Sequence, residues 1–295
     1  MRKQTIRALR AVQQLPHPVA AEPTRLSPCD ELRDLAGENH WDLTYASRHE
    51  SVRDWEPKMY EDRAISNAFD MALNGRRPAS IFEIGCGDSH WLPYLGKRYT
   101  ASRVSGVDYS SRGCELARAR LKAAGISGTV YESDLFKLSP KVTGQFDLVF
   151  SLGVVEHFSD LNTVLTRIAS FVAPEGVLVT EVPNLCSIHG LMTWVWQPEV
   201  FRKHKIVRER DINSIYSAMG FVDVHSTKVG LFSLSVPAWP LNYRWPRLQR
   251  RLLPRILRAT TLTSTVLNRV GVYRGFPFFA PYIMSWAQRR EIVRH

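Results

Sequence analysis

Residues 80–90 read SIFEIGCGDSH, and this stretch decides how the rest of the chain is interpreted. A strand-like run that holds one carboxylate, Glu83, is followed by two glycines, Gly85 and Gly87. Glycines at this spacing allow a tight turn and a close approach of the backbone to a ligand. A dinucleotide-binding loop would place a third glycine at position 90, where this chain has His90. The stretch therefore predicts a ligand-binding turn after a buried strand and leaves the ligand open.

The sequence from residue 79 onward alternates between β-type runs and helical patterns. Such alternation is typical of a parallel sheet with helices on both faces, so we expect an α/β fold with seven strands. The expected strands are 80–84, 103–108, 128–132, 146–152, 176–182, 221–229 and 279–288. The expected helices are 89–99, 111–125, 161–173 and 208–220.

Polar residues follow several of these strands at the edge of the sheet where ligands bind in open α/β folds. Asp108 ends the second expected strand, and Asp134 follows the third. An acid at the first position is suited to accept hydrogen bonds from ribose hydroxyls. An acid at the second position, Asp134, is placed to accept a hydrogen bond from an adenine amino group. Because the fourth strand end also carries polar groups, the set predicts a nucleoside-containing ligand.

These motifs make the chain resemble class I S-adenosylmethionine-dependent methyltransferases of the small-molecule type over residues 41–288. The likeness rests on FEIGCGDS, VSGVDYS, YESDLF and FDLVFSLGVVEHF, on the later segment APEGVLVTEVPN, and on the lead-in HWDLTYASRHESVRDW. The resemblance implies a Rossmann-like sheet, S-adenosylmethionine as the cofactor and S-adenosylhomocysteine as the product. It also implies transfer of a methyl group to an oxygen or nitrogen of a small-molecule or lipid-linked metabolite.

The same resemblance implies a set of cofactor-binding residues. In it, Glu83 would polarise the methionine amino end through the loop, Asp108 would hold the ribose, and Tyr109 would lie against the adenine. Taken singly, Glu83 could instead be a buried capping acid, and Asp108 could cap the helix that starts near Ser110. The full set is Tyr45, Glu83, Gly85, Cys86, Gly87, Asp108, Tyr109, Asp134, Leu135, Ser151 and Leu152.

Catalytic residues are expected just past the strand 146–152. Neutral imidazole suits proton removal near pH 7, so His157 is the candidate general base, with Glu156 orienting it or shaping the pocket. The alternative is a purely structural Glu-His pair. No metal is predicted, because Gly153 replaces the first carboxylate of the Glu-x-x-Glu-His pattern of metal-binding relatives. A site poor in carboxylates binds hard cations weakly.

Two insertions leave from the ligand-binding edge and are expected to form a roof over the substrate, residues 183–207 and 237–277. Both are rich in aromatic and basic residues, and Trp and Tyr side chains suit amphipathic ligands. The candidate substrate-contacting residues are His189, Trp194, Trp196, His204, Trp239 and Tyr243.

The positive charge of the chain is concentrated near its C-terminus. The net charge is +11, and residues 224–290 hold eleven basic residues and no acidic one. Residues 247–258 place leucines and an isoleucine on one helical face among arginines, which is the pattern of a basic interfacial helix. An anionic membrane surface is therefore a candidate partner through residues 244–258. Packing of the leucines on the enzyme's own body is the alternative.

The domain boundaries follow from these assignments. We expect a tail and leading helix over residues 1–40, the methyltransferase domain over 41–288 and a short tail over 289–295. The basic N-terminal stretch reads either as a disordered tail or as a transit peptide. Four widely spaced cysteines without a metal-ligand pattern indicate reduced thiols, so a cytoplasmic protein is expected. Peripheral attachment of this protein to a membrane surface is the alternative location.

Two other functional classes stay open at this point. An RNA or protein methyltransferase could use the basic insertion to hold a macromolecule, although the sequence contains no recognised RNA-binding module and nucleic acid is the less favoured partner. A non-catalytic cofactor-binding module is the other. The number of subunits is left open.

Overall fold

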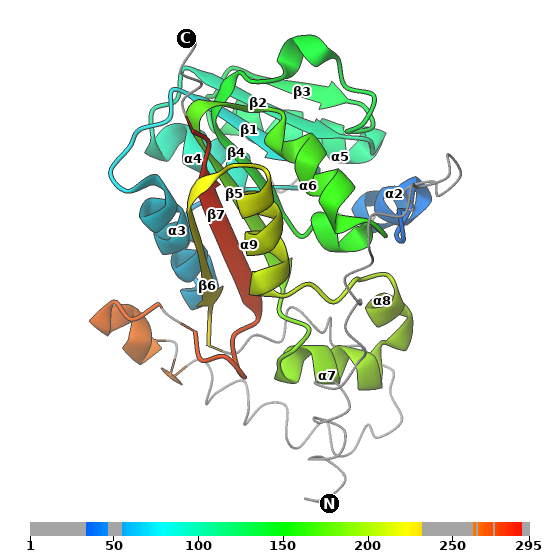
Figure 1. Ribbon diagram of the computed structural model, residues 1–295, viewed down its shortest axis with the longest axis vertical. Coiled ribbons are helices and arrows are strands. Elements are labelled where there is room, and N and C mark those ends of the chain that lie inside the picture. Colours follow the sequence, from blue (N-terminus) through cyan, green and yellow to red (C-terminus); the bar gives the residue numbers. More distant parts are fainter. Residues whose placement is uncertain (1–33, 47–54, 232–261, 264, 274, 291–295) are drawn as a thin grey trace, which may run out of the picture.

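The computed structural model describes residues 34–46, 55–231, 262–263, 265–273 and 275–290. Its centre is one seven-stranded sheet with the strand order β3-β2-β1-β4-β5-β7-β6 (Figure 1). The strands are β1 (Ser80–Ile84), β2 (Arg103–Asp108), β3 (Gly128–Glu132), β4 (Phe146–Leu152), β5 (Val172–Pro183), β6 (Val222–Val229) and β7 (Tyr282–Gln288). Neighbouring strands from β3 to β5 are parallel, whereas β7 runs antiparallel to both β5 and β6. The predicted α/β class and strand count are confirmed.

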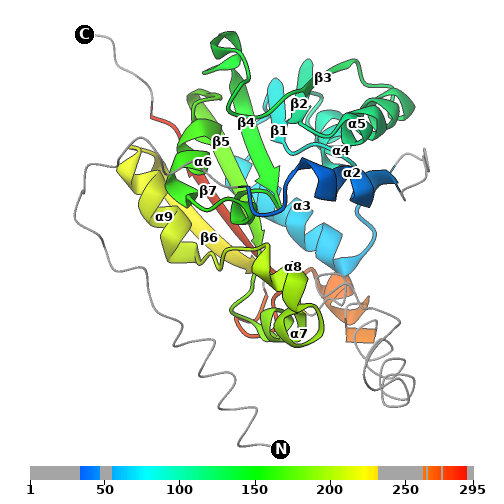
Figure 2. The ribbon, with the colours of Figure 1, turned by 90° about the vertical axis from the view of Figure 1, so that its right-hand side faces the viewer.

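Helices cover both faces of this sheet. On one face, α3 (Tyr60–Leu73), α4 (Trp91–Arg98) and α5 (Ser111–Ala123) pack against alternate strand residues such as Ile81 and Leu148. On the other face, α6 (Leu161–Ala169) and α9 (Glu209–Ala218) pack against Phe82 and Val149 (Figure 2). Because both faces are covered, the central strands are apolar along almost their whole length.

Helices α2 (Glu38–Ala46), α7 (Ile188–Trp196) and α8 (Pro198–Arg202) lie outside these two layers. Two short 3₁₀ turns, η1 (Pro140–Val142) and η2 (Val155–His157), follow β3 and β4 in the chain. Among the described helices, none is both long and apolar enough to cross a membrane. The described cysteines, Cys86, Cys114 and Cys186, are free thiols.

The largest departure from the predicted boundaries lies between residues 169 and 176, and the last strand begins at Tyr282 rather than at residue 279. The helix expected to reach residue 173 ends at Ala169, and β5 begins at Val172 rather than at residue 176. The reason is the pairing of Val172 with Phe146 at the start of β4, followed by a shift in register. Glu175 takes a left-handed backbone conformation inside this irregular segment. The strand therefore includes the Pro-Glu-Gly sequence that looks like a helix-ending turn.

The two predicted insertions are described to different extents. Residues 183–207 form α7, α8 and their connections at the end of β5. Residues 237–261 of the second insertion lie outside the described residues, as do 264 and 274.

Candidate functional site

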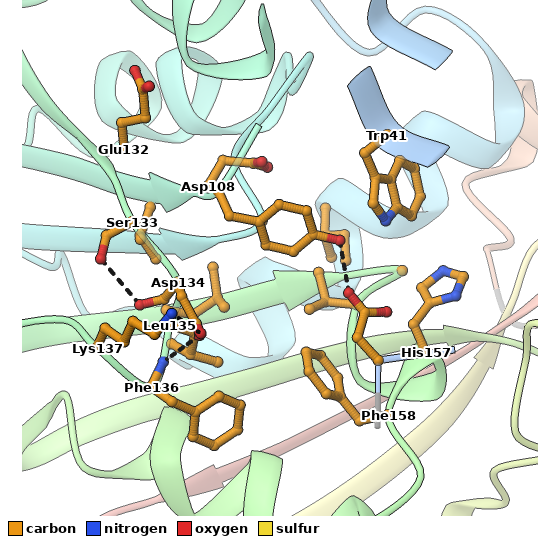
Figure 3. Close-up of a pocket in the computed structure, with 18 of the residues that line it drawn as sticks. Trp41, Asp108, Glu132, Ser133, Asp134, Leu135, Phe136, Lys137, His157 and Phe158 are labelled. Carbon is orange, nitrogen blue, oxygen red and sulfur yellow. Dashed lines mark hydrogen bonds and ion pairs between the residues drawn. The ribbon is translucent and has the colours of Figure 1, made fainter. Parts of the chain in front are cut away.

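A pocket of about 640 Å³ opens at the carboxyl ends of β1, β2, β3 and β4. Trp41, His157 and Phe158 lie on one side of it, and Ser133, Asp134 and Phe136 lie on the other (Figure 3). Eight residues expected in the cofactor or catalytic sets line it: Tyr45, Gly85, Asp108, Tyr109, Asp134, Leu135, Leu152 and His157. The edge of the sheet predicted from the sequence is therefore the edge that carries the cavity.

The loop after β1 requires a glycine at its first position. Gly85 has a φ of +72°, and a Cβ added there would lie 2.5 Å from Cγ2 of Val154 at the end of β4. The amides of Gly85 and Cys86 both donate to the carbonyl of Val107, at 2.8 and 3.1 Å. These bonds hold the turn against the end of β2, so that its backbone faces the pocket.

Asp108 organises the same turn from β2. Its Oδ2 accepts the amide of Gly87 at 2.9 Å, and its Oδ1 accepts the amide of Ser110 at 2.8 Å. Burial, with 8% of the residue exposed, raises the pKa of this carboxyl group, while the two amides oppose the rise. The N-cap of α5 is Ser110, whose hydroxyl accepts the amide of Gly113. Because each carboxylate oxygen can accept a second hydrogen bond, Asp108 keeps capacity for a ligand.

Glu83 lies beneath the loop and does not line the pocket. The residue is 1% exposed, and burial raises the pKa of its carboxyl group well above the usual range. A hydrogen bond with the Ser89 side chain opposes that rise. Within the described part of the chain, its Oε2 has no hydrogen-bond partner. Its expected action through the loop stays a prediction.

Three other members of the expected cofactor set also lie outside the pocket lining, namely Cys86, Gly87 and Ser151. Cys86 is fully buried against the glycine of β2, Gly106. The Ser151 hydroxyl hydrogen-bonds to the Thr180 hydroxyl at 3.4 Å, within the sheet. These residues support the floor of the site, and their direct contact with a cofactor stays a prediction.

An N-terminal segment, residues 34–46, closes over the pocket. The hydroxyl of Tyr109 donates to Asp34 at 2.9 Å, and the amide of Leu35 donates to the carbonyl of His157 at 2.7 Å. The indole of Trp41 meets the imidazole of His157 edge to face, with ring centroids 5.3 Å apart. Trp41 belongs to the lead-in motif identified in the sequence, whereas no sequence pattern near Asp34 predicted that it lines the pocket.

His157 stands where the acceptor side of the pocket is expected. Its Nδ1 lies 3.0 Å from the carbonyl oxygen of Lys203, which can only accept, so Nδ1 carries the proton and Nε2 keeps its lone pair. Burial and the neighbouring His204 lower the pKa of His157 to about 4, so the ring is neutral near pH 7.

Glu156 is buried next to His157 and does not line the pocket. Its Oε1 is 3.9 Å from Nε2 of His157, which is too far for a hydrogen bond. Burial raises the pKa of Glu156 to about 8. The Lys203 carbonyl, rather than Glu156, therefore makes the hydrogen bond that orients the imidazole.

The residues expected to contact substrate are scattered in the structure, and none of the described ones lines the pocket. His189 is fully buried at the start of α7, and Trp194 is 51% exposed on the same helix. Trp196 is the last residue of α7. The ring centroids of His204 and His157 are 4.4 Å apart. Trp239 and Tyr243 lie outside the described residues. Among the members of this set that the structure describes, only His204 lies at the acceptor side.

Comparison with known protein families shows the family of the chain. Residues 59–226 match the family model described as a methyltransferase domain. The chain belongs to this methyltransferase family. Its fold is that of class I S-adenosylmethionine-dependent methyltransferases, as the sequence motifs predicted.

Two solved structures, one of them a methyltransferase, share this fold. The plantazolicin methyltransferase BamL, solved in complex with a triazolic desmethylPZN analog and SAH, aligns with a TM-score of 0.52 and 16% identity, over 84% of this chain and 89% of that one. The YcgJ protein of Bacillus subtilis aligns with a TM-score of 0.52 and 14% identity, over 78% of this chain and 99% of that one.

Curated relatives are similar over a shorter stretch. The trans-aconitate 2-methyltransferase of Paracidovorax citrulli is 27% identical over 45% of this chain and 52% of its own length. The enzyme of the same name from Deinococcus radiodurans is 31% identical over 44% of this chain and 49% of its own length. The chain thus spans about half the length of the curated relatives it matches.

Proposed function

We propose that this protein transfers the methyl group of S-adenosylmethionine to an oxygen or nitrogen atom of a small-molecule acceptor. The observation that carries the proposal is the pocket of about 640 Å³ at four adjacent strand ends. One end of it is formed by the Gly85 turn and Asp108, and the other by His157. Membership of the methyltransferase family supports the same reaction.

The donor end would be held by residues that follow β1, β2 and β3. The free lone pairs of Asp108 suit the two ribose hydroxyls, and the Gly85 turn leaves room for the methionine moiety. Tyr109 and Leu135 supply apolar surface for an adenine ring, and Asp134 lies beside them to accept from its amino group. Glu83, Cys86, Gly87 and Ser151 would act by holding this surface from below.

The chemical step asks little of the protein beyond alignment and exclusion of water, because the sulfonium carries a good leaving group. The Asp34–Tyr109 hydrogen bond and the Trp41 indole close the pocket on the N-terminal side. His157 is neutral near pH 7 and presents an Nε2 lone pair, so it would accept the proton of a hydroxyl acceptor as the bond to the methyl carbon forms. Its pKa of about 4 makes it a weak base, so its contribution to the rate would be small.

The acceptor is proposed at the level of its class. The similar trans-aconitate 2-methyltransferases favour a small molecule. A narrower version of this proposal is a lipid-linked acceptor, with residues 244–258 bound to an anionic membrane. These residues lie outside the described ones.

Incubation with methyl-labelled S-adenosylmethionine and fractionated host extract tests the proposal. We expect label in the small-molecule or lipid fraction with the natural chain, and less label in the same fraction with an Asp108→Asn variant at a limiting cofactor concentration. Label confined to RNA or protein would replace the proposal with a macromolecular acceptor. Tight S-adenosylhomocysteine binding without label in any fraction would identify a non-catalytic module.

A further inference from the structure

Beside the pocket, the structure assembles a cluster that the sequence does not reveal: Glu156, His157 and His204. One ligand atom from each of the three side chains lies within 4.8 Å of the other two. Glu156 and His157 belong to η2, whereas His204 follows α8. His157 lines the pocket, so the cluster stands at its wall.

The cluster is held together by backbone contacts between η2 and the segment 203–205. The Nδ1 of His157 donates to the Lys203 carbonyl at 3.0 Å. The backbone amide of Lys205 donates to the Glu156 carbonyl at 2.6 Å, and the side-chain ammonium of Lys205 donates to the Ser159 carbonyl at 2.8 Å. Because these bonds flank His204 on both sides, its position next to His157 is fixed by the fold.

Both imidazoles are oriented as metal-bound histidines usually are. The Nδ1 of His157 faces the Lys203 carbonyl, and the Nδ1 of His204 faces the Val200 carbonyl at 2.7 Å. Carbonyl oxygens only accept, so each ring carries its proton on Nδ1 and presents an Nε2 lone pair. A backbone acceptor on the second ring nitrogen is the typical outer contact that orients a histidine ligand.

The carboxylate supplies a second, independent observation. Glu156 is 2% exposed, and its Oε2 has no hydrogen-bond partner in the described part of the chain. A buried polar atom without a partner is costly, and such atoms in native proteins usually indicate an absent water or ion. A cation between the carboxylate and the two lone pairs would satisfy all three groups.

We propose that Glu156, His157 and His204 form a binding site for one divalent metal ion of the borderline class, Zn²⁺ foremost. Two imidazoles and one carboxylate are a typical ligand set for Zn²⁺ with one position open, whereas Mg²⁺ and Ca²⁺ prefer sites built from oxygen ligands. The proposal revises the expectation of no metal. The expectation excluded any metal, but its reason applied to hard cations and to the residues near Gly153, and His204 was not considered as a ligand.

Metal binding and the base role of His157 exclude each other, because both use the same Nε2 lone pair. The base role therefore belongs to the metal-free chain. Because Glu156 and His204 do not line the pocket, metal binding and cofactor binding can be measured separately on the same chain.

Metal titration of the full chain, without an affinity tag and after chelator treatment, tests the site. Elemental analysis after gel filtration with ZnCl₂ should give one Zn²⁺ per chain, and calorimetry should show one site. CoCl₂ should give the visible absorption bands of a four-coordinate ion. We expect His204→Gln and Glu156→Gln each to weaken Zn²⁺ binding by at least about 100-fold and to remove those bands. The exposed His225 is the matched control, and His225→Gln should bind as the natural chain does.

Substoichiometric Zn²⁺ in the natural chain would overturn the proposal. Unchanged affinity and cobalt bands in both His204→Gln and Glu156→Gln would overturn it as well, because the ion would then sit elsewhere. Circular dichroism and S-adenosylhomocysteine calorimetry on the same samples verify that the variants are folded. A chain that binds S-adenosylhomocysteine and no metal disproves the metal site alone, whereas one that binds metal and no S-adenosylhomocysteine disproves the proposed function alone.

Discussion

The two ends of the pocket are built in different ways. At the donor end, Gly85 follows β1, Asp108 ends β2 and Asp134 lies two residues beyond β3, so that parallel strand order brings them together. At the acceptor end, His157 meets His204 from beyond α8 and Trp41 from the N-terminal side. The donor end is thus local in the sequence, and the acceptor end depends on tertiary packing.

The two ends also treat buried carboxylates differently. Burial raises the pKa of Asp108, but two backbone amides donate to its oxygens and limit the rise. Burial raises the pKa of Glu156 to about 8, and one of its oxygens has no partner in the described residues. Nearby on β5, burial and then Glu156 raise the pKa of Glu181 well above its usual range. Asp108, which lines the donor end, thus has a partner for each of its oxygens. The buried Glu83 beneath the donor-end loop and Glu156 at the acceptor end each have one oxygen without a partner in the described residues.

The largest effect is expected at the donor end, from Gly85→Ala. A methyl group there meets Val154 and forces a left-handed backbone on a residue that disfavours it, so the turn must move. We expect S-adenosylhomocysteine affinity, measured by calorimetry, to fall by more than about 100-fold. Gly75→Ala is the matched control, since Gly75 also has a positive φ but has open space around it. Equal affinities for the two variants would show that the turn does not bind the donor.

The next effect concerns Asp108→Asn. Hydrogen bonds to charged groups contribute about 1.5–3 kcal/mol, which corresponds to a loss of roughly 10- to 100-fold in S-adenosylhomocysteine affinity. Asp160→Asn serves as control, because Asp160 is an exposed N-cap of α6 outside the pocket. Retained affinity in Asp108→Asn would remove the proposed ribose contact.

A third prediction concerns the acceptor end and the pH dependence of stability. Burial raises the pKa of Glu156 from 4.5 to about 8, so the folded chain binds more protons than the unfolded chain between these values. The free energy of unfolding therefore falls as the pH rises through this window, by about 1.4 kcal/mol per pH unit from this group. In the Glu156→Gln variant, the free energy of unfolding should not contain this pH-dependent contribution.

Urea unfolding of chelator-treated protein at several pH values measures this slope. Above pH 8 the stability difference between the natural chain and Glu156→Gln should become constant. Parallel curves from pH 4.5 to 8 would mean that Glu156 ionises normally in the folded chain.

The smallest effect is expected from Asp34→Asn. The variant weakens one hydrogen bond, from Tyr109 to Asp34, and leaves the strand ends untouched. Since the bond contributes about 1 kcal/mol, we expect a few-fold faster dissociation of S-adenosylhomocysteine in stopped-flow measurements. An unchanged dissociation rate would show that the N-terminal segment does not hold the ligand.

The contrast between the two ends explains what could be predicted from the sequence. The strands and the residues Asp108, Asp134 and Gly85 were predictable, because strand periodicity and the carboxyl-edge rule act on neighbouring residues. Asp34 was not, because its contact with Tyr109 joins distant segments. The insertion 183–207 was expected to cover the substrate, yet only His204 of its candidate residues reaches the acceptor side. Aromatic composition identifies neither the direction nor the partner of a side chain.

Calorimetric titration of the purified chain with S-adenosylhomocysteine tests the central claim, that the four strand ends bind the donor, most directly. We predict one binding site per chain, with binding lost in Gly85→Ala and retained in Gly75→Ala. The absence of heat in the natural chain, or equal binding by the two variants, would contradict the account.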